Sequence, residues 1–304
     1  HCQYCDSPDR MKAGAGKETL FSSLADQMPV SWIYICGIGE PMFRDNRVIL
    51  KNILELCGDR DIRCSAFSNV SLIDQDILGH IESGTLSLLF KFDSLHADVL
   101  NGLYGTTRAQ KQIDNVKCLC DHAYIADDET NLAASIVLTR KNIDELPRLL
   151  DFCENNRVFP FVAELEHAGR GTACMNDLAL SKKELCQVKD LLETTYGYFN
   201  TPFCPSAIAG IHVDNGNNVV VDARTGLSCH WFWMEDPQVK SLGLASPSTS
   251  YDEIKKNLMQ YRRDKLPDVR KIAKTHPESP IGGCGGDISK LLNLYLSCTM
   301  PQTR

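Results

Sequence analysis

Two cysteines near the start of the chain have a spacing that suits metal or redox chemistry. The chain opens His1-Cys2-Gln3-Tyr4-Cys5, a Cys-x-x-Cys pair. Thioredoxin-like redox chemistry and a zinc site are both fair interpretations of such a pair. It gains weight from Gly37-Ile38-Gly39-Glu40-Pro41, which follows the next predicted strand. Glycines there let the backbone approach a ligand closely, and Glu40 can accept a hydrogen bond from an ammonium group. The alternative is an ordinary β–α turn with an incidental acid.

Strands alternate with helices through the first part of the chain. Apolar, β-branched runs predict strands, and apolar residues at helical spacing predict the helices between them. The predicted strands are 31–36, 62–67, 85–92, 132–138 and 159–164. The predicted helices lie at about 47–57, 74–82, 95–100, 108–120 and 142–152, the last with Asn142 as its N-cap. This alternation indicates right-handed crossovers and a parallel sheet, with the chemistry gathered at the carboxyl ends of the strands.

The pattern changes after about residue 200. Residues 208–213 and 218–221 predict a hairpin around Asn215-Gly216, a strong turn signal. Helices are expected at about 251–261 and 288–297. We therefore expect one domain over residues 1–197 and a smaller one over residues 198–304.

Together, the early motifs resemble those of the radical S-adenosylmethionine (radical SAM) superfamily. Its signature is Cys-x3-Cys-x2-Cys followed by a Gly-Gly-Glu-Pro-type motif. Cys2 and Cys5 match the second and third cysteines, and Tyr4 matches the aromatic residue before the third. The first cysteine and the first barrel strand are then expected before His1. The resemblance implies a partial (β/α)6 TIM-like barrel.

The resemblance also implies the cofactors. Three thiolates would bind a 4Fe–4S cluster and leave one iron open for S-adenosylmethionine. An electron from an external flavodoxin- or ferredoxin-like reductant would then lead to a 5′-deoxyadenosyl radical that abstracts a hydrogen atom. Residues 67–72 look like the family's Thr-Asn-Gly-type segment, although Val70 stands where the family often has glycine. The cofactor-binding residues so implied are Tyr4, Gly37, Gly39, Glu40, Ser68, Asn69, Lys91, Val137 and Arg170.

Four cysteines in the second part of the chain resemble the family's auxiliary-cluster extension in its reduced form. The full form, called SPASM, has a Cys-x2-Cys-x5-Cys-x3-Cys run that this chain lacks; the short form is called twitch. We expect a second 4Fe–4S cluster held by Cys204, Cys229 and Cys284, with Cys298 as the fourth ligand. The alternatives are buried thiols or, for one of them, a thiol that donates a hydrogen atom to a substrate radical.

Four residues are candidates for catalysis: Cys229, Glu164, His167 and Asp93. Asp93 and Glu164 are expected to point from strand ends into the barrel mouth, and His167 to accept a proton, since imidazole titrates near neutrality. The remaining cysteines are expected to pack in the core: Cys36, Cys57, Cys64, Cys118, Cys120, Cys153, Cys174 and Cys186.

The composition of the chain limits the classes of molecule that it is expected to bind. The 304 residues include 14 cysteines, and 32 basic against 39 acidic side chains give a net charge of −7. That charge argues against a nucleic-acid partner. Without a long apolar run or a basic, apolar leader, we expect a cytoplasmic protein with no membrane partner.

The expected function is hydrogen abstraction from a small polar molecule, such as an aminosugar or aminocyclitol of natural-product biosynthesis, leading to dehydrogenation or epimerisation. Family members with reduced auxiliary domains motivate this substrate class. The alternative is maturation of a ribosomally made peptide. A different class is a non-enzymatic zinc or iron–sulfur binding module, against which the Gly-Ile-Gly-Glu-Pro turn and the long barrel pattern argue.

Overall fold

The computed structural model describes residues 26, 30–35, 39–126, 129–165, 171–195, 220–221, 228–229, 250, 252–253, 256, 260 and 263. The chain divides into one unit of residues 1–18 and 29–179 and another of residues 19–28 and 180–304. This division assigns helix α8 (Lys182–Thr195) to the second unit, whereas the sequence predicted the boundary after residue 197. The first unit contains most of the described residues.

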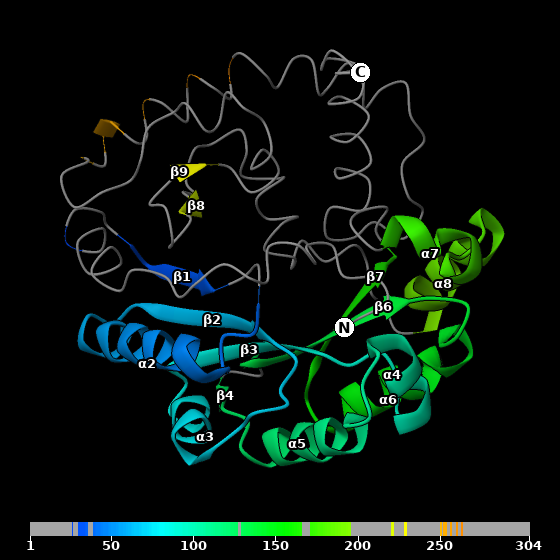
Figure 1. Cartoon of the computed structure of the whole chain (residues 1–304), viewed down its shortest axis with the longest axis horizontal. Helices are drawn as coiled ribbons and strands as arrows, with labels where there is room; N and C mark the ends of the chain where they lie inside the picture. Colours follow the sequence, from blue (N-terminus) through cyan, green and yellow to red (C-terminus); the bar gives the residue numbers. More distant parts are fainter. Residues whose placement is uncertain are drawn as a thin grey trace. The chain divides into compact units, whose positions relative to one another are not determined.

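A parallel sheet forms the centre of the first unit (Figure 1). Its strands are β1 (Trp32–Ile35), β2 (Arg63–Ser68), β3 (Leu86–Lys91), β6 (Leu132–Leu138) and β7 (Phe159–Glu164), and they lie side by side in that order. Each neighbouring pair is parallel, so every connection crosses back over the sheet. The five strands predicted from the sequence are confirmed to within one residue at each end, and with them the α/β barrel class.

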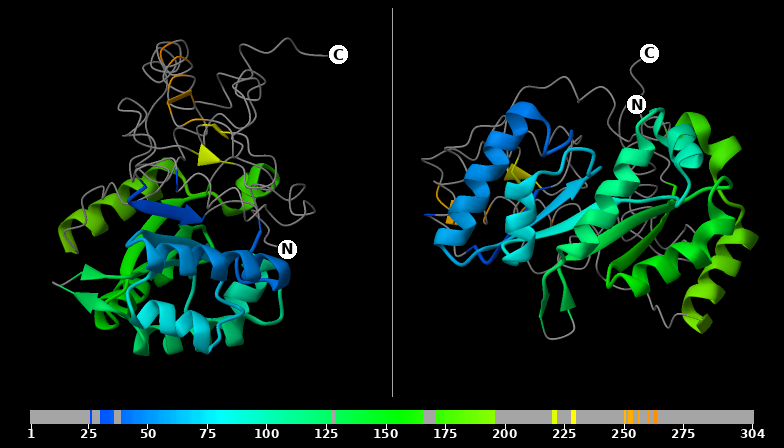
Figure 2. Two further views of the ribbon diagram at one scale, coloured as in Figure 1. Left: turned by 90° about the vertical axis from the view of Figure 1, so that its left-hand side faces the viewer. Right: turned by 90° about the horizontal axis from the view of Figure 1, so that it is seen from below.

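Helices cover one face of this sheet. They are α2 (Arg44–Asp59), α3 (Gln75–Glu82), α4 (Ala97–Tyr104), α5 (Ala109–Asp121), α6 (Leu146–Asn155) and α7 (Gly171–Leu178). Seen from below, α2, α3, α5 and α6 stand in front of the strands (Figure 2). The sequence predicted each of them except α7, and also missed α8 and the small hairpin of β4 (Ile125–Ala126) and β5 (Glu129–Thr130).

The two faces of the sheet differ in burial. Strand side chains alternate between faces, and partners in a parallel register share a face. On the helix side, Leu88, Phe90 and Ile136 are among the side chains with at most 1% exposure. On the other face, Lys91 is paired with Ser135, and both are half-buried. The helix side is therefore the apolar core, and the opposite face carries Lys91 and Ser135.

The cysteines expected in the core divide into two groups. Cys57, Cys64 and Cys153 are buried, which confirms the prediction for them. The thiols of Cys57 on α2 and Cys64 on β2 form a hydrogen bond, and this bond together with burial raises the pKa of Cys64. The prediction is wrong for Cys186, which is exposed on α8 because it lies on the polar side of that helix. Cys118, Cys120 and Cys174 are half-buried, and Cys36 lies outside the described residues.

Asn142 occupies the position predicted for it but has a different role. It precedes a 3-10 turn, η2 (Ile143–Glu145), and its side chain makes no capping hydrogen bond. Its amide instead accepts from the N–H and hydroxyl of Thr139 and donates to two carbonyl oxygens, those of Asp93 and Val137. The amide does not cap the helix because the ends of β3 and β6 offer it two donors and two acceptors, and the helix start does not.

The predicted second domain is described only in part. β8 (Val220–Val221) pairs antiparallel with β9 (Ser228–Cys229). The predicted turn at Asn215-Gly216 and the helix at 288–297 lie outside the described residues.

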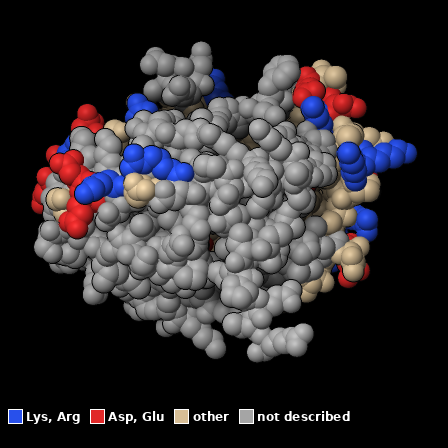
Figure 3. Space-filling model, turned by 90° about the horizontal axis from the view of Figure 1, so that it is seen from above, with Lys and Arg blue, Asp and Glu red and all other residues tan. Residues whose placement is uncertain are grey.

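Among the helices that the structure describes, none has the length and apolar character needed to cross a membrane. On the face shown in Figure 3, the visible described side chains carry both signs of charge next to one another.

Candidate functional site

The ends of four strands bring the sequence-predicted residues of the barrel to one edge of the sheet. We call this the carboxyl edge: residues 39–42 after β1, 68–71 at the end of β2, 91–96 at the end of β3 and 137–145 at the end of β6. Parallel α/β sheets bind their ligands at this edge, because the loops that leave the strands there converge. Gly39, with a φ of 117°, has a backbone conformation that favours glycine.

Glu40 joins the loop after β1 to the end of β2. Its Oε1 accepts from the hydroxyl of Ser68 at 2.6 Å and from the N–H of Met42 at 3.2 Å. Its Oε2 accepts from the N–H of Asn69 at 2.7 Å. Burial raises the pKa of Glu40, and these three donors oppose the shift because they favour the charged form. The carboxylate predicted to receive an ammonium group therefore already holds three donors of its own chain.

Val70 has an unusual backbone conformation at the same place. Its φ is 51°, and its side chain is completely buried. A β-branched residue in the left-handed region is strained by about 1–3 kcal/mol. Its N–H donates to the Ser68 hydroxyl at 2.9 Å, and its carbonyl accepts from Asn115 Nδ2 on α5 at 2.7 Å. The conformation explains why glycine suits this position in the family that the motifs resemble.

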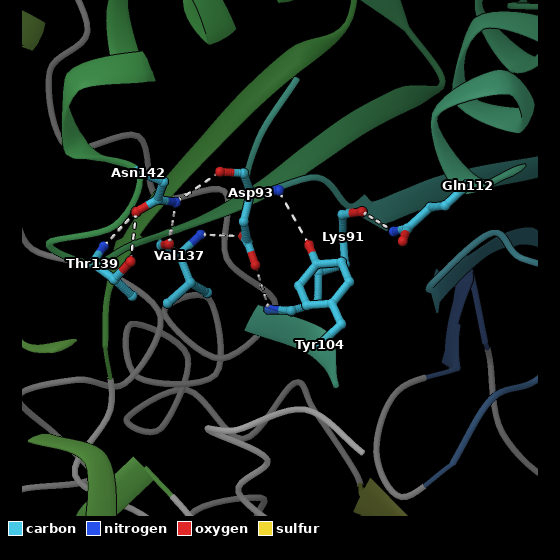
Figure 4. A network of polar contacts seen from close by, with 7 residues as sticks. All are labelled: Lys91, Asp93, Tyr104, Gln112, Val137, Thr139 and Asn142. Carbon is cyan, nitrogen blue, oxygen red and sulfur yellow. Dashed lines mark hydrogen bonds and ion pairs between the residues drawn. The ribbon is translucent and has the colours of Figure 1, made fainter. Parts of the chain in front are cut away.

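Asp93 ties the end of β3 to β6 (Figure 4). Its Oδ1 accepts from the N–H of Val137 at 2.7 Å, and its Oδ2 lies 3.3 Å from Lys91 Nζ. The side chain has 0% exposure. The sequence led us to expect Asp93 to face the substrate, and that role stays a prediction. Among the described residues, its carboxylate contacts Lys91 and the backbone of Val137, both of which the sequence predicted to bind the cofactor.

Lys91 is the accessible charge of this network. Its side chain is 25% exposed. The ammonium group lies 5.6 Å from the centre of the Tyr104 ring, a cation–π contact, and the Tyr104 hydroxyl accepts from the Asp93 N–H. Gln112 on α5 donates to the Lys91 carbonyl at 2.7 Å. Gln112 therefore holds the backbone of Lys91, while the Asp93 carboxylate and the Tyr104 ring hold its ammonium group (Figure 4).

Glu145 is a buried carboxylate that we did not single out from the sequence. Both of its oxygens accept from the Ser94 hydroxyl, at 2.8 and 2.9 Å, and Oε2 also accepts from the N–H of Leu95 at 3.1 Å. It ties the loop after β3 to the turn after β6. An acidic residue at a helix start is ordinary in a sequence, so only its burial reveals this contact.

Glu164 ends β7 with 6% exposure. Its register partner is Leu138, which belongs to the helix-covered face of the sheet. The register places Glu164 in the same row as Leu138, and Ser68 lies in the row of Phe90 on the same face. The place of Glu164 in the barrel mouth, expected from the sequence, stays a prediction.

The other predicted site residues lie outside the described residues: Cys2, Tyr4, Cys5, Gly37, His167, Arg170, Cys204, Cys284 and Cys298. Of Cys229 only the backbone is described, which pairs with Val220. Within the described part of the chain, no group of three or more His, Cys, Asp and Glu side chains is arranged to hold a metal ion. The cluster ligands stay predictions.

The described edge suits a ligand with charged and hydrogen-bonding groups. Lys91 contributes an ammonium group, and Asn69 is exposed there with an amide whose Oδ1 accepts from the Ser71 N–H. These are groups that the carboxylate and hydroxyl groups of S-adenosylmethionine can engage. The residues present therefore fit the cofactor that the motifs imply.

Neither a protein-family model nor a curated protein matches the sequence. Solved structures do match. The structure "Native anSMEcpe with bound AdoMet and Cp18Cys peptide" has a TM-score of 0.61 and 13% identity, over 98% of this chain and 93% of that one. SuiB of Streptococcus suis bound to S-adenosylmethionine has a TM-score of 0.58 and 16% identity, over 78% of this chain. The match covers 58% of SuiB, less than two thirds of its length.

At such low identity these similarities show the fold. Both matched structures contain S-adenosylmethionine, and both have the partial barrel of radical SAM enzymes. The strand order, the helix-covered face and the carboxyl edge described above belong to that architecture. The chain therefore has the radical SAM fold that its cysteine and glycine motifs resemble.

Proposed function

We propose that the chain is a radical SAM enzyme. The observation that carries the proposal is the match of its fold, over 98% of the chain, to a structure with bound S-adenosylmethionine. The Cys-x-x-Cys pair of Cys2 and Cys5 and the Glu40 motif support it from the sequence. When bound, the 4Fe–4S cluster and S-adenosylmethionine supply a 5′-deoxyadenosyl radical that removes a hydrogen atom from the substrate.

Different residues of the chain would bind the cluster, bind the cofactor and support the site. Cys2 and Cys5 would hold the cluster, and Lys91 and Asn69 would contact the cofactor at the carboxyl edge. Asp93 orients the Lys91 ammonium group, and Glu145 fixes the loop that follows β3. Such supporting contacts keep a site in its productive geometry without reorganisation during the reaction.

For the substrate we propose a peptide. The matched anSMEcpe structure contains a peptide, and the two chains overlap over nearly their whole lengths. This support is stronger than any feature of the described residues that favours the aminosugar or aminocyclitol expected from the sequence. The net charge of −7 suits a cationic substrate of either kind. The outcome, dehydrogenation or epimerisation, depends on the region of Cys229 and stays a proposal.

The first experiment tests whether the chain cleaves S-adenosylmethionine by radical chemistry. The full chain is reconstituted anaerobically with iron and sulfide, reduced, and mixed with S-adenosylmethionine. We expect 5′-deoxyadenosine, and we expect Cys5→Ala to abolish it while Cys186→Ala, a change at an exposed cysteine, leaves it intact. A reconstituted chain that binds S-adenosylmethionine but never forms 5′-deoxyadenosine contradicts the proposal.

The second experiment asks for the substrate. Peptides and aminosugars deuterated at carbon are added to the same mixture, and the deuterium content of 5′-deoxyadenosine is measured. Deuterium from a peptide carbon is the expected result. Deuterium that comes from aminosugars and never from peptides would reverse the substrate proposal and leave the radical proposal standing.

A further inference from the structure

We propose that Glu40 is a positioning residue whose carboxylate locks the turn of residues 68–71 and that it acts on cofactor binding through this turn. The effect on S-adenosylmethionine binding rests on the function proposed above. The lock itself rests only on contacts within the chain. Its elements are Glu40, the Ser68 hydroxyl and the strained backbone of Val70.

A chain of hydrogen bonds connects the carboxylate to the strained residue. Ser68 Oγ donates to Glu40 Oε1 at 2.6 Å, and the same oxygen accepts from the Val70 N–H at 2.9 Å. The carboxylate also accepts directly from the Asn69 N–H at 2.7 Å. Glu40 therefore holds two consecutive N–H groups of the turn, one directly and one through the serine.

The turn is held from its other side by α5. Asn115 Nδ2 donates to the Val70 carbonyl at 2.7 Å, and the Val70 side chain has 0% exposure. A strained left-handed residue persists only where its surroundings determine it from several directions. Without the Glu40 carboxylate, only the hydrogen bond from Asn115 and the packing of the side chain still hold Val70. We therefore expect Val70 to relax to a negative φ.

Such a relaxation would move Asn69. Its N–H is the group bound by Glu40, and its side chain is exposed at the carboxyl edge. A carboxylate has about four acceptor positions, and Glu40 uses three of them within the chain. Glu40 thus shapes the edge through the backbone of the turn.

The two possible roles of Glu40 predict different results for a double variant. Glu40→Gln replaces one acceptor by a donor, so the turn loses a partner, and S-adenosylmethionine should bind about tenfold more weakly by calorimetry on the reconstituted full chain. Glycine adopts a positive φ without strain, so adding Val70→Gly should restore affinity to within about threefold of the unchanged chain. Adding Val70→Ala removes side-chain atoms but keeps the strain, so it should not restore it.

A direct contact between Glu40 and the cofactor predicts the opposite. The loss would then persist in the Glu40→Gln, Val70→Gly double variant, and that result would overturn the proposal. Equal rescue by Val70→Ala and Val70→Gly would overturn it as well, because strain would not be the cause. Glu55→Gln, at an exposed position on α2, is the matched control and should bind like the unchanged chain.

Hydrogen exchange gives a readout that does not need the cofactor. In Glu40→Gln the amides of Asn69 and Val70 should exchange at least about tenfold faster, while the amides in the middle of β3 keep their rates. Unchanged exchange at both amides would disprove the lock. If the unchanged chain fails to bind S-adenosylmethionine, the function proposed above fails, but the exchange experiment still decides whether the lock exists.

Discussion

At the scale of single residues, buried and half-buried carboxylates of the carboxyl edge accept hydrogen bonds from the backbone of the protein itself. Glu40, Asp93 and Glu145 each accept a hydrogen bond from the N–H of a neighbouring segment. A buried charge is tolerated only where it is paired or hydrogen-bonded, and backbone N–H groups at strand ends supply such donors. Acidic residues that look like catalysts in the sequence can therefore be part of the scaffold.

Asp93→Asn tests this role of Asp93. The amide cannot serve both Lys91 and the Val137 N–H as a carboxylate does, so we expect the free energy of unfolding to fall by about 2–3 kcal/mol. Urea unfolding measures it, with Asp59→Asn at an exposed position as a control that should change little. A variant of unchanged stability that lacks turnover would instead indicate a direct catalytic role.

The buried thiol of Cys153 predicts a dependence of stability on pH. Burial, with the nearby Cys120 as a smaller cause, raises the pKa of Cys153 from 9.0 to about 12. Above pH 9 the unfolded chain releases this proton while the folded chain keeps it, so the free energy of unfolding falls as the pH rises.

Cys153→Ala removes this titration and should make the decline shallower, as urea unfolding at about pH 8, 9 and 10 would show. Cys186→Ala, at an exposed position, should keep the original slope. Equal slopes for the Cys153→Ala variant and the unchanged chain would contradict the assignment.

At the scale of elements, the turn between α3 and β3 depends on a glycine. Gly84 has a φ of 74°, and a Cβ atom there would lie 3.0 Å from the ring of Tyr124. Gly84→Ala should lower the free energy of unfolding by about 1–2 kcal/mol, because an L-residue is strained in that conformation.

Gly79 in α3 is the matched position. It is exposed, and a Cβ atom there would meet no atom within 4 Å. Gly79→Ala should raise the free energy of unfolding by about 0.5–1 kcal/mol, since alanine favours a helix. Thermal unfolding of the two variants should therefore shift in opposite directions, and shifts of the same sign would refute the explanation.

The elements themselves were largely predictable. The five strands and the helices between them follow from hydrophobic periodicity, which is local in sequence. The hairpin of β4 and β5 was missed because its strands have two residues each, too few for a two-residue period to show. Asn142 was predicted as a helix cap because residue type and position suit one, but its amide found better partners at the ends of β3 and β6.

At the scale of the whole molecule, the number of irons bound per chain tests whether the predicted auxiliary cluster exists. Two 4Fe–4S clusters give about eight irons per chain, and one gives about four. Cys284→Ala should lower the count towards about four while the cluster bound by Cys2 and Cys5 is retained, and 5′-deoxyadenosine formation should continue. About four irons in the unchanged chain would remove the second cluster. Iron and sulfide analysis of the anaerobic protein, with Cys186→Ala as control, decides between these outcomes.

The sequence by itself determined the order of the elements, because periodicity and glycine turns are local patterns. The cofactor class comes from the resemblance of its cysteine and glycine motifs to those of the radical SAM superfamily and stays a proposal. Only the tertiary structure decided which polar residues of the carboxyl edge bind the chain's own backbone. The acceptors at Glu40, Asp93 and Glu145 meet N–H donors 29, 44 and 50 residues away in sequence. Folding brings such groups together through the register of parallel strands, and no local pattern encodes that distance.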